Sequence, residues 1–291
     1  METISVFEKQ LELGTDPKEL CKAHRFFDEY FNVFNKDHNF KENTKKILYK
    51  YSKESIYKTF NILKNTFEKK VNFISGLLDL KIIPSLIVFI GDGSVDGHGA
   101  LVNGKPYVFF DLSSIIQRFE NYNIDLFVTH ELLHGIHYSY NPCFYPKYYN
   151  SIEEKYFKRM IAEGIATNLS PTFSSSIIED SYWMGFLNKK EVQIWVDNCE
   201  KMKNNIVYRI NSSLKSSSFD ENLYHTLYTI SDLKHLTNSR LAYYYGSQII
   251  NELRDYKSIN EILSTDYEYF KDCILSYFHK IDLNGYNKIC N

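Results

Sequence analysis

The sequence predicts an α+β protein that is mostly helical and contains one small β-sheet. Apolar residues recur every three or four positions through the first 80 residues and again after residue 150, which is typical of amphipathic helices. Between these stretches, residues 81–112 are rich in β-branched residues and glycine, as in short strands joined by tight turns. We therefore expect an N-terminal helical region over residues 1–80 and a second domain over residues 81–291 that contains the sheet.

Length, charge and cysteine content exclude several classes of protein. A chain of 291 residues can bury a substantial core in one or two domains. The net charge of -2 and the pI near 6.5 argue against a nucleic-acid-binding surface. The five cysteines are scattered and form no C-x-x-C pair, which fits a reducing compartment. No secretory signal and no apolar run of about 20 residues occurs, so we expect a cytoplasmic monomer without a membrane partner.

The N-terminal region contains two recognisable helix patterns. Asp16 followed by Pro17 predicts a helix start, because aspartate caps the first turn and proline is tolerated within it. Residues 43–79 carry an apolar position at every third or fourth residue, which predicts a long, broken helix or a pair of helices. No chemistry is indicated in this region.

Residues 81–112 predict about three strands. Residues 86–90 form a β-branched run, and residues 100–102 and 107–112 flank Asn103 and Gly104, a pair that suits a type I′ hairpin turn. Pro106 beside this turn indicates an edge strand, because proline cannot donate a hydrogen bond to a neighbouring strand.

The connection before the hairpin is rich in glycine and carries two aspartates and a histidine that could bind a metal ion. Asp92 and Asp96 lack the twelve-residue spacing of an EF-hand, so we do not expect calcium there. We expect His98 to be a loop residue and not a metal ligand.

The strongest chemical pattern is His-Glu-x-x-His, from His130 to His134, within a predicted helix over residues 124–138. Residues four apart share one face of a helix, so His130 and His134 can bind one metal ion. Glu131 then stands beside the ion, where it can take a proton from a metal-bound water. The flanking residues are apolar, and burying three polar side chains without partners would be costly, which favours a metal site.

A catalytic zinc usually takes a third protein ligand. Tyr140 stands where the metzincin pattern requires a histidine, so that class is disfavoured. Glu163 is the best-placed candidate, because small residues around it let its helix approach another helix closely. His137 is expected to be structural, and Glu153 and Glu154 are alternatives at a helix start.

The remainder of the chain, residues 151–291, is expected to form a helical lower lobe. Ser151 opens its first helix with a capping-box-like pattern. Further helices are expected over residues 181–205, 236–253 and 259–278, with a serine-rich break at residues 212–218.

Two of these motifs together resemble a known group of enzymes. The His-Glu-x-x-His stretch with Glu163-Gly-Ile-Ala downstream resembles the gluzincin zinc metallopeptidases, and more narrowly the DUF2268 family of predicted zinc-dependent proteases. Residues 91–112 and residues 242–250 are similar to two further family stretches, the second to a Gly-Tyr-x-x-Gly segment. The resemblance covers residues 80–255 and implies a zincin-like domain over residues 81–291, with a small sheet at 81–112, a zinc helix at 124–138 and the helical lobe below.

The resemblance implies one catalytic Zn²⁺ held by His130, His134 and Glu163, with Glu131 as general base. The sequence departs from the gluzincin pattern at Thr167, where thermolysin-like members have an aspartate that orients a histidine. The groups that orient the ligands must therefore differ.

The resemblance also implies a tyrosine near the zinc, and Tyr243 occupies its place, with Tyr244 beside it. Such a phenol can donate to the oxyanion of a tetrahedral intermediate. We expect a peptidase whose peptide or protein substrate pairs with an edge strand within residues 98–112. A non-catalytic metal-binding scaffold, a zinc hydrolase of a non-peptide amide and a purely structural helical protein are the alternatives.

Overall fold

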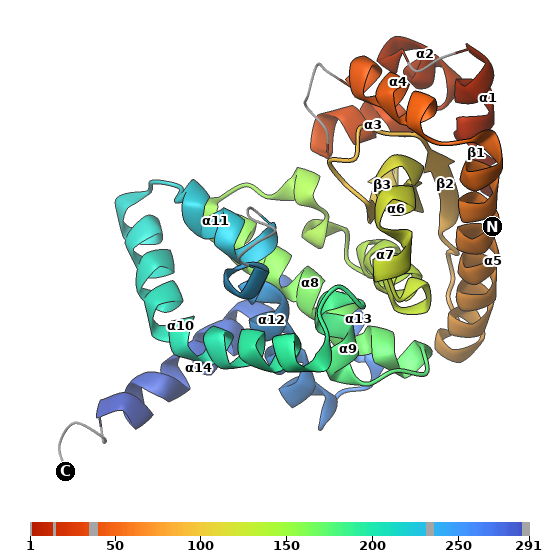
Figure 1. Cartoon of the computed structure of the whole chain (residues 1–291). Coiled ribbons are helices and arrows are strands. Elements are labelled where there is room, and N and C mark those ends of the chain that lie inside the picture. Colours follow the sequence, from red (N-terminus) through yellow and green to blue (C-terminus); the bar gives the residue numbers. More distant parts are fainter. Residues whose placement is uncertain (1, 14–15, 35–39, 231–235, 287–291) are drawn as a thin grey trace.

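A small mixed sheet lies to one side of the molecule, and helices form the rest (Figure 1). The computed structural model describes residues 2–13, 16–34, 40–230 and 236–286. The sheet has the order β1-β2-β4-β3, with β1 parallel to β2, β2 parallel to β4, and β3 antiparallel to β4. Its strands are β1 (Thr3–Ser5), β2 (Ser85–Phe89), β3 (Gly97–Val102) and β4 (Lys105–Asp111). The predicted α+β class is therefore confirmed.

The predicted hairpin is present between β3 and β4. Asn103 and Gly104 have φ angles of 50° and 76°, the left-handed pair that a type I′ turn requires. The inference from Pro106 is wrong, because β4 lies inside the sheet and β3 is the edge. Proline is tolerated there because pairing with β2 begins one residue later, at Tyr107. His98 lies in β3, so its expected place in a loop is also wrong.

Among the described residues, five helices precede β2. Asp16 caps the second of them as predicted, and its side chain accepts a hydrogen bond from the Lys18 amide. The predicted break in residues 43–79 falls at Ser52, which caps the last helix. The strand Thr3–Ser5 lies in the stretch that was expected to be wholly helical. The sequence does not predict this strand, because three residues are too few to show an alternating pattern. The helices are α1 (Val6–Leu13), α2 (Pro17–Ala23), α3 (Phe26–Val33), α4 (Phe40–Lys50) and α5 (Lys53–Leu78).

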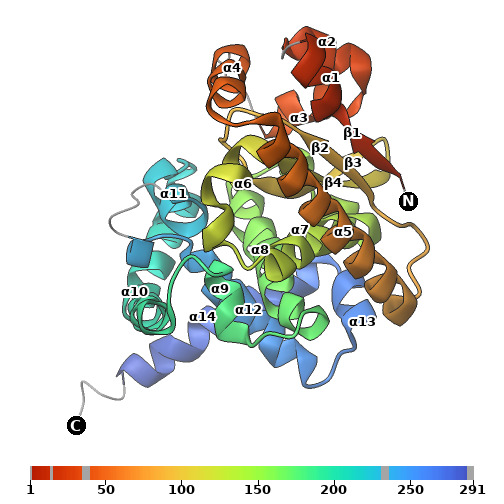
Figure 2. The same cartoon turned by 45° about the vertical axis from the view of Figure 1, so that its right-hand side comes forward.

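The sheet is covered on both faces, so β4 is apolar between its terminal residues Lys105 and Asp111. Phe109 packs against rings of α3, including Phe26 at 5.5 Å between ring centroids. Phe110 points the other way and contacts Phe127 of the helix α7 (Ile124–Tyr140) at 5.4 Å. In two views of the molecule, α5 runs alongside the sheet and α7 (Figures 1 and 2).

The helix α7 contains the His-Glu-x-x-His motif and begins after Asn123, whose side chain accepts a hydrogen bond from the Leu126 amide. It lies directly against the edge strand. A Cβ on Gly99 of β3 would stand 2.3 Å from the Gly135 amide nitrogen, so only glycine allows this approach. The strand β3 and the middle of α7 are therefore held in backbone contact.

A second close approach joins α8 (Ile152–Phe173) to α12 (Leu241–Arg254). A Cβ on Gly164 would stand 2.4 Å from the Gly246 carbonyl carbon, and one on Gly246 would stand 2.1 Å from the Met160 carbonyl oxygen. The small residues around Glu163 thus serve close helix packing, as predicted, and they bring α12 beside the motif.

The other helices surround this pair. The predicted helix at 181–205 is divided at Met184, which adopts a left-handed conformation. The serine-rich break is shorter than predicted, since α10 continues to Ser216 and ends at the left-handed Ser217. Across the described residues, no helix is long and apolar enough to cross a membrane. The remaining elements are α6 (Leu112–Arg118), α9 (Ile178–Trp183), α10 (Lys189–Ser216), α11 (Glu221–Tyr228), α13 (Ile259–Ser264) and α14 (Tyr267–Tyr286), with 3-10 turns at Phe119–Asn121, Pro142–Phe144, Pro146–Tyr148 and Leu236–Asn238.

Replacing Gly246 by alanine tests the contact between α8 and α12. The added methyl group would force the helices apart, so we expect the free energy of unfolding to fall by about 1–3 kcal/mol in urea titrations. Gly76→Ala is the matched control, because its Cβ would meet nothing within 4 Å. Alanine is the better helix former, so this control should be at least as stable as the parent. Equal losses in both variants would contradict the role given to the contact.

Candidate metal centre

Two adjacent helices bring together the three predicted metal ligands. His130 and His134 lie one turn apart on α7, and their Nε2 atoms are 3.2 Å apart. Glu163 enters from α8, with its Oε2 atom 3.2 Å from His134 Nε2 and 3.5 Å from His130 Nε2. The three side chains come from two helices whose separation is set by close packing, and all three are buried.

The separations between these atoms match those of ligands around one zinc ion. Zinc–ligand bonds of 2.0–2.2 Å in a tetrahedron place neighbouring ligand atoms about 3.3 Å apart. Glu163 Oε2 is buried and accepts no hydrogen bond from any described residue. A buried carboxylate oxygen of this kind calls for a cation, and two imidazoles with one carboxylate are a donor set that zinc accepts.

The electrostatics of the cluster favour the protonation states that metal ligands need. Burial lowers the pKa of His130 to about 4, so its ring is neutral at pH 7 and its lone pair is free. Burial alone would raise the pKa of Glu163, but His134, His130 and Arg159 hold it well below its usual range. The carboxylate is therefore charged. Burial and the charge of Glu163 raise the pKa of Glu131 well above its usual range.

Arg159 stabilises the outer oxygen of the ligand carboxylate. It lies one turn before Glu163 on α8, and its Nε atom is 3.5 Å from Glu163 Oε1. Its guanidinium also packs over the rings of Tyr224 and Tyr228, and it donates a hydrogen bond to the Tyr224 hydroxyl. This arrangement leaves Oε2 as the oxygen that faces the histidines. The sequence analysis did not identify Arg159, although its i,i+4 spacing from Glu163 is visible in the sequence.

The structure adds His98, which the sequence analysis set aside. Its Nδ1 atom is 3.4 Å from Glu131 Oε2, and its Nε2 atom is 3.1 Å from the Tyr138 hydroxyl. Its ring centroid is 4.2 Å from that of His134. His98, Glu131 and His134 form a second group with metal-ligand spacing, which meets the first at His134. This position depends on the contact between Gly99 and Gly135, which no sequence pattern reveals.

The two candidate tyrosines face in different directions. The Tyr243 ring lies nearly parallel to the His130 ring, with 6.0 Å between centroids. The Tyr244 hydroxyl donates instead to Glu200 on α10, at 2.6 Å. Of the two, only Tyr243 is beside the metal ligands.

The alternative third ligands lie outside the cluster. His137 packs against Phe144, its two ring nitrogens have no hydrogen-bond partner among the described residues, and burial lowers its pKa to about 3. Glu153 accepts a hydrogen bond from Tyr267 and pairs with Lys271 at 2.8 Å. Glu154 pairs with Lys158. Neither of the groups with metal-ligand spacing in the described chain includes these residues, Asp92 or Asp96.

The histidine ligands are not oriented in the thermolysin-like way. The Nδ1 atoms of His130 and His134 have no hydrogen-bond partner among the described residues, and neither has the Thr167 hydroxyl. Packing must therefore orient the two rings: that of His134 lies between His98 and Tyr138, and that of His130 against Tyr243.

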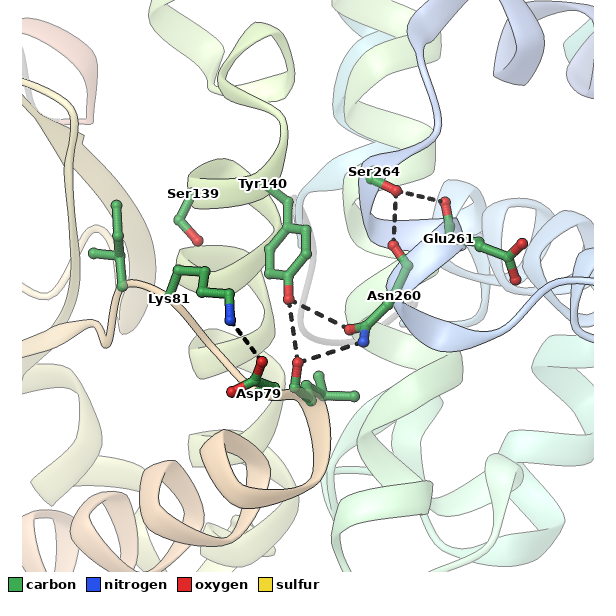
Figure 3. A pocket seen from close by; sticks show the side chains of 9 residues that line it. Asp79, Lys81, Ser139, Tyr140, Asn260, Glu261 and Ser264 are labelled. Carbon is green, nitrogen blue, oxygen red and sulfur yellow. Dashed lines mark hydrogen bonds and ion pairs between the residues drawn. The ribbon is translucent and has the colours of Figure 1, made fainter.

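A surface pocket of about 430 Å³ lies at the C-terminal end of α7, away from the ligands (Figure 3). Figure 3 shows the hydrogen bond that the Tyr140 hydroxyl donates to the Asn260 side chain. Both side chains also donate a hydrogen bond to the carbonyl oxygen of Leu78. Lys81 is likewise paired with Asp79. The polar groups drawn together there satisfy one another, and the pocket contains none of the metal-ligand candidates.

Comparisons of the chain with protein-family models, curated proteins and solved structures give no match. The site is therefore interpreted from its own geometry.

The ligand set can be tested by elemental analysis. We expect one zinc per chain, and we expect Glu163→Ala to weaken zinc binding by more than about 100-fold, because the loss of an outer partner alone costs 10–100-fold. Glu153→Ala is the matched control on the same helix and should retain zinc fully. Zinc held equally by both variants would exclude Glu163 as a ligand.

Proposed function

We propose that this protein is a zinc-dependent peptidase with a zincin-like arrangement of edge strand, metal helix and helical lower lobe. The observation that carries the proposal is the set of three ligand atoms at mutual distances of 3.2–3.5 Å, with Glu131 next to them in the chain. This donor set is open to a water molecule or substrate atom in the fourth position, as a catalytic zinc requires.

Zinc bound at these residues would polarise the scissile carbonyl and lower the pKa of a water molecule. Glu131 accepts the proton of that water and passes it to the leaving amine. Burial and the charge of Glu163 raise the pKa of Glu131, which makes its carboxylate a stronger base toward that proton. His98 lies beside the Glu131 carboxylate, 3.4 Å away on the side of the edge strand. We assign the donor to the developing oxyanion to Tyr243, because its ring lies beside that of His130.

Access to the centre is narrow on the side of the sheet. All of β3 except His98 is buried, so a peptide cannot pair along the whole strand as the sequence analysis expected. The side chain of His98 is 15% exposed, whereas those of His130, His134 and Glu163 are at most 3% exposed. Substrate therefore reaches the centre at the His98 end of the strand.

A non-catalytic metal protein is the competing interpretation, and a hydrolase of a non-peptide amide is another. A binding-only centre has no use for Glu131, whose Oε2 atom is buried without a hydrogen-bond partner among the described residues. Retaining such a carboxylate costs stability, which favours a catalytic role. Hydrolases of peptides and hydrolases of other amides differ in the residues that line the site and not in its chemistry. Activity assays with substrates of both classes therefore separate the two.

Glu131→Gln tests the catalytic proposal. The amide cannot accept a proton, so hydrolysis should fall by about 10²–10⁴-fold while one zinc per chain is retained. The measurement is mass spectrometry of peptide-library digests beside zinc analysis. Full activity in this variant, or loss of its zinc, would remove Glu131 from the role of general base.

Tyr243→Phe tests the oxyanion donor. Loss of one donor should lower kcat by about 10²–10³-fold and change KM little, since the interaction forms in the transition state. Tyr244→Phe removes a hydroxyl that bonds Glu200, so it should keep kcat within about twofold. Equal changes of kcat in the two variants would contradict the role of oxyanion donor given to Tyr243.

A further inference from the structure

A second arginine lies near the proposed centre, and its charge has no partner among the described residues. Arg240 directly precedes α12 and adopts a left-handed conformation, with φ of 61°. It is 7% exposed. Its guanidinium carbon lies 3.9 Å from the centroid of the Tyr243 ring and 5.2 Å from that of Trp183, the last residue of α9.

The guanidinium of Arg240 makes no hydrogen bond or ion pair with any described residue. The other arginines in the helical lobe do have partners: Arg159 pairs with Glu163, Arg209 with Asp220, and Arg254 with Asn168. Two aromatic rings attract a guanidinium but do not accept its five N–H donors. A buried charge in this state is costly, and an anion would satisfy it.

The surroundings of Arg240 supply a second donor without a partner. Trp183 Nε1 is buried and donates to no described residue. The guanidinium lies over the Trp183 ring, so two buried donors without partners belong to neighbouring side chains, and donors of this kind suit an anion and not a cation. Arginine is also the residue that binds a carboxylate through two parallel hydrogen bonds.

Tyr243 connects this cation to the metal ligands. The Tyr243 ring contacts the guanidinium and is also stacked with His130. Together, the 3.9 Å and 6.0 Å separations place the guanidinium carbon no more than 9.9 Å from the centroid of the His130 ring. An extended chain spans about 3.3–3.6 Å per residue, so about three residues or fewer cover this distance.

We propose that Arg240 binds the C-terminal carboxylate of the substrate, so that the enzyme removes a few residues from the end of a peptide. This inference rests on the proposed peptidase function and names its substrate class. The buried edge strand supports it, because His98 is the one residue of β3 that is not buried, and a strand buried elsewhere admits a chain end more readily than the middle of a chain. The group bound at Arg240 is a carboxylate, which can come from the C-terminus of a peptide or from an acidic side chain.

The test measures binding to the Glu131→Gln protein, loaded with zinc, by titration calorimetry. Three probes are compared: acetyl-Gly-Phe with a free carboxylate, the same peptide as its C-terminal amide, and acetyl-Asp-Phe amide. We expect the free acid to bind at least about tenfold more tightly than either amide, which is the scale of one charge-assisted contact. Adding Arg240→Gln should abolish this preference, and Arg240→Lys should keep part of it.

Arg254→Gln, at the far end of α12, is the matched control and should keep the preference. Helix content and zinc content are measured for every variant, so that unfolding is not mistaken for loss of the anion site. Equal binding of acid and amide, no binding of either, or a preference that survives Arg240→Gln would overturn the proposal. Tight binding of acetyl-Asp-Phe amide would also overturn it and assign Arg240 to an acidic side chain.

Failure of the proposed peptidase function has a different outcome. A protein that takes up no zinc, or that hydrolyses no peptide in its unsubstituted form, refutes the catalytic proposal. The preference for acid over amide is then measured on the zinc-free protein, where its loss in Arg240→Gln still decides whether this residue binds a carboxylate.

Discussion

The burial of Glu163 between two imidazoles is the constraint on which the rest of the structure depends. A charged carboxylate 2% exposed must be balanced, and the described chain offers it Arg159 on one oxygen and the imidazoles of His130 and His134 on the other. That arrangement requires α7 and α8 to lie against each other with little tolerance. The close approaches of Gly99 to Gly135 and of Gly164 to Gly246 fix each of the two helices from its other side, since they hold α7 against β3 and α8 against α12 through backbone contacts.

Much of this could be predicted from the sequence, because periodic patterns and local turn chemistry are short-range. The hairpin at Asn103, the cap at Asp16 and the common face of His130 and His134 all follow from neighbours within a few positions. Glu163 could be proposed because the small residues beside it indicated close packing. In each case the physical cause acts within one element or one turn of chain.

The features that could not be predicted depend on contacts between distant elements. His98 reaches Glu131 only because Gly99 rests on Gly135, and the direction of Tyr243 depends on where α12 crosses α8. The prediction from Pro106 was wrong because a proline marks an edge strand only if no other strand pairs with its strand on the second side. Here β2 pairs with β4 from Tyr107 onward. Arg240 carried no pattern at all, since its buried charge is set by the positions of Trp183 and Tyr243.

The pairing of β1 with β2 has a consequence for synthesis of the chain. Thr3 is aligned with Leu86, so the first strand leaves the ribosome about eighty residues before its partner. At 5–20 residues per second this interval lasts several seconds, longer than a helix needs to form. The helices α1–α5 can therefore form while the first strand has no neighbour. During this interval the edges of the strand are unpaired, and they can pair with strands of other nascent chains.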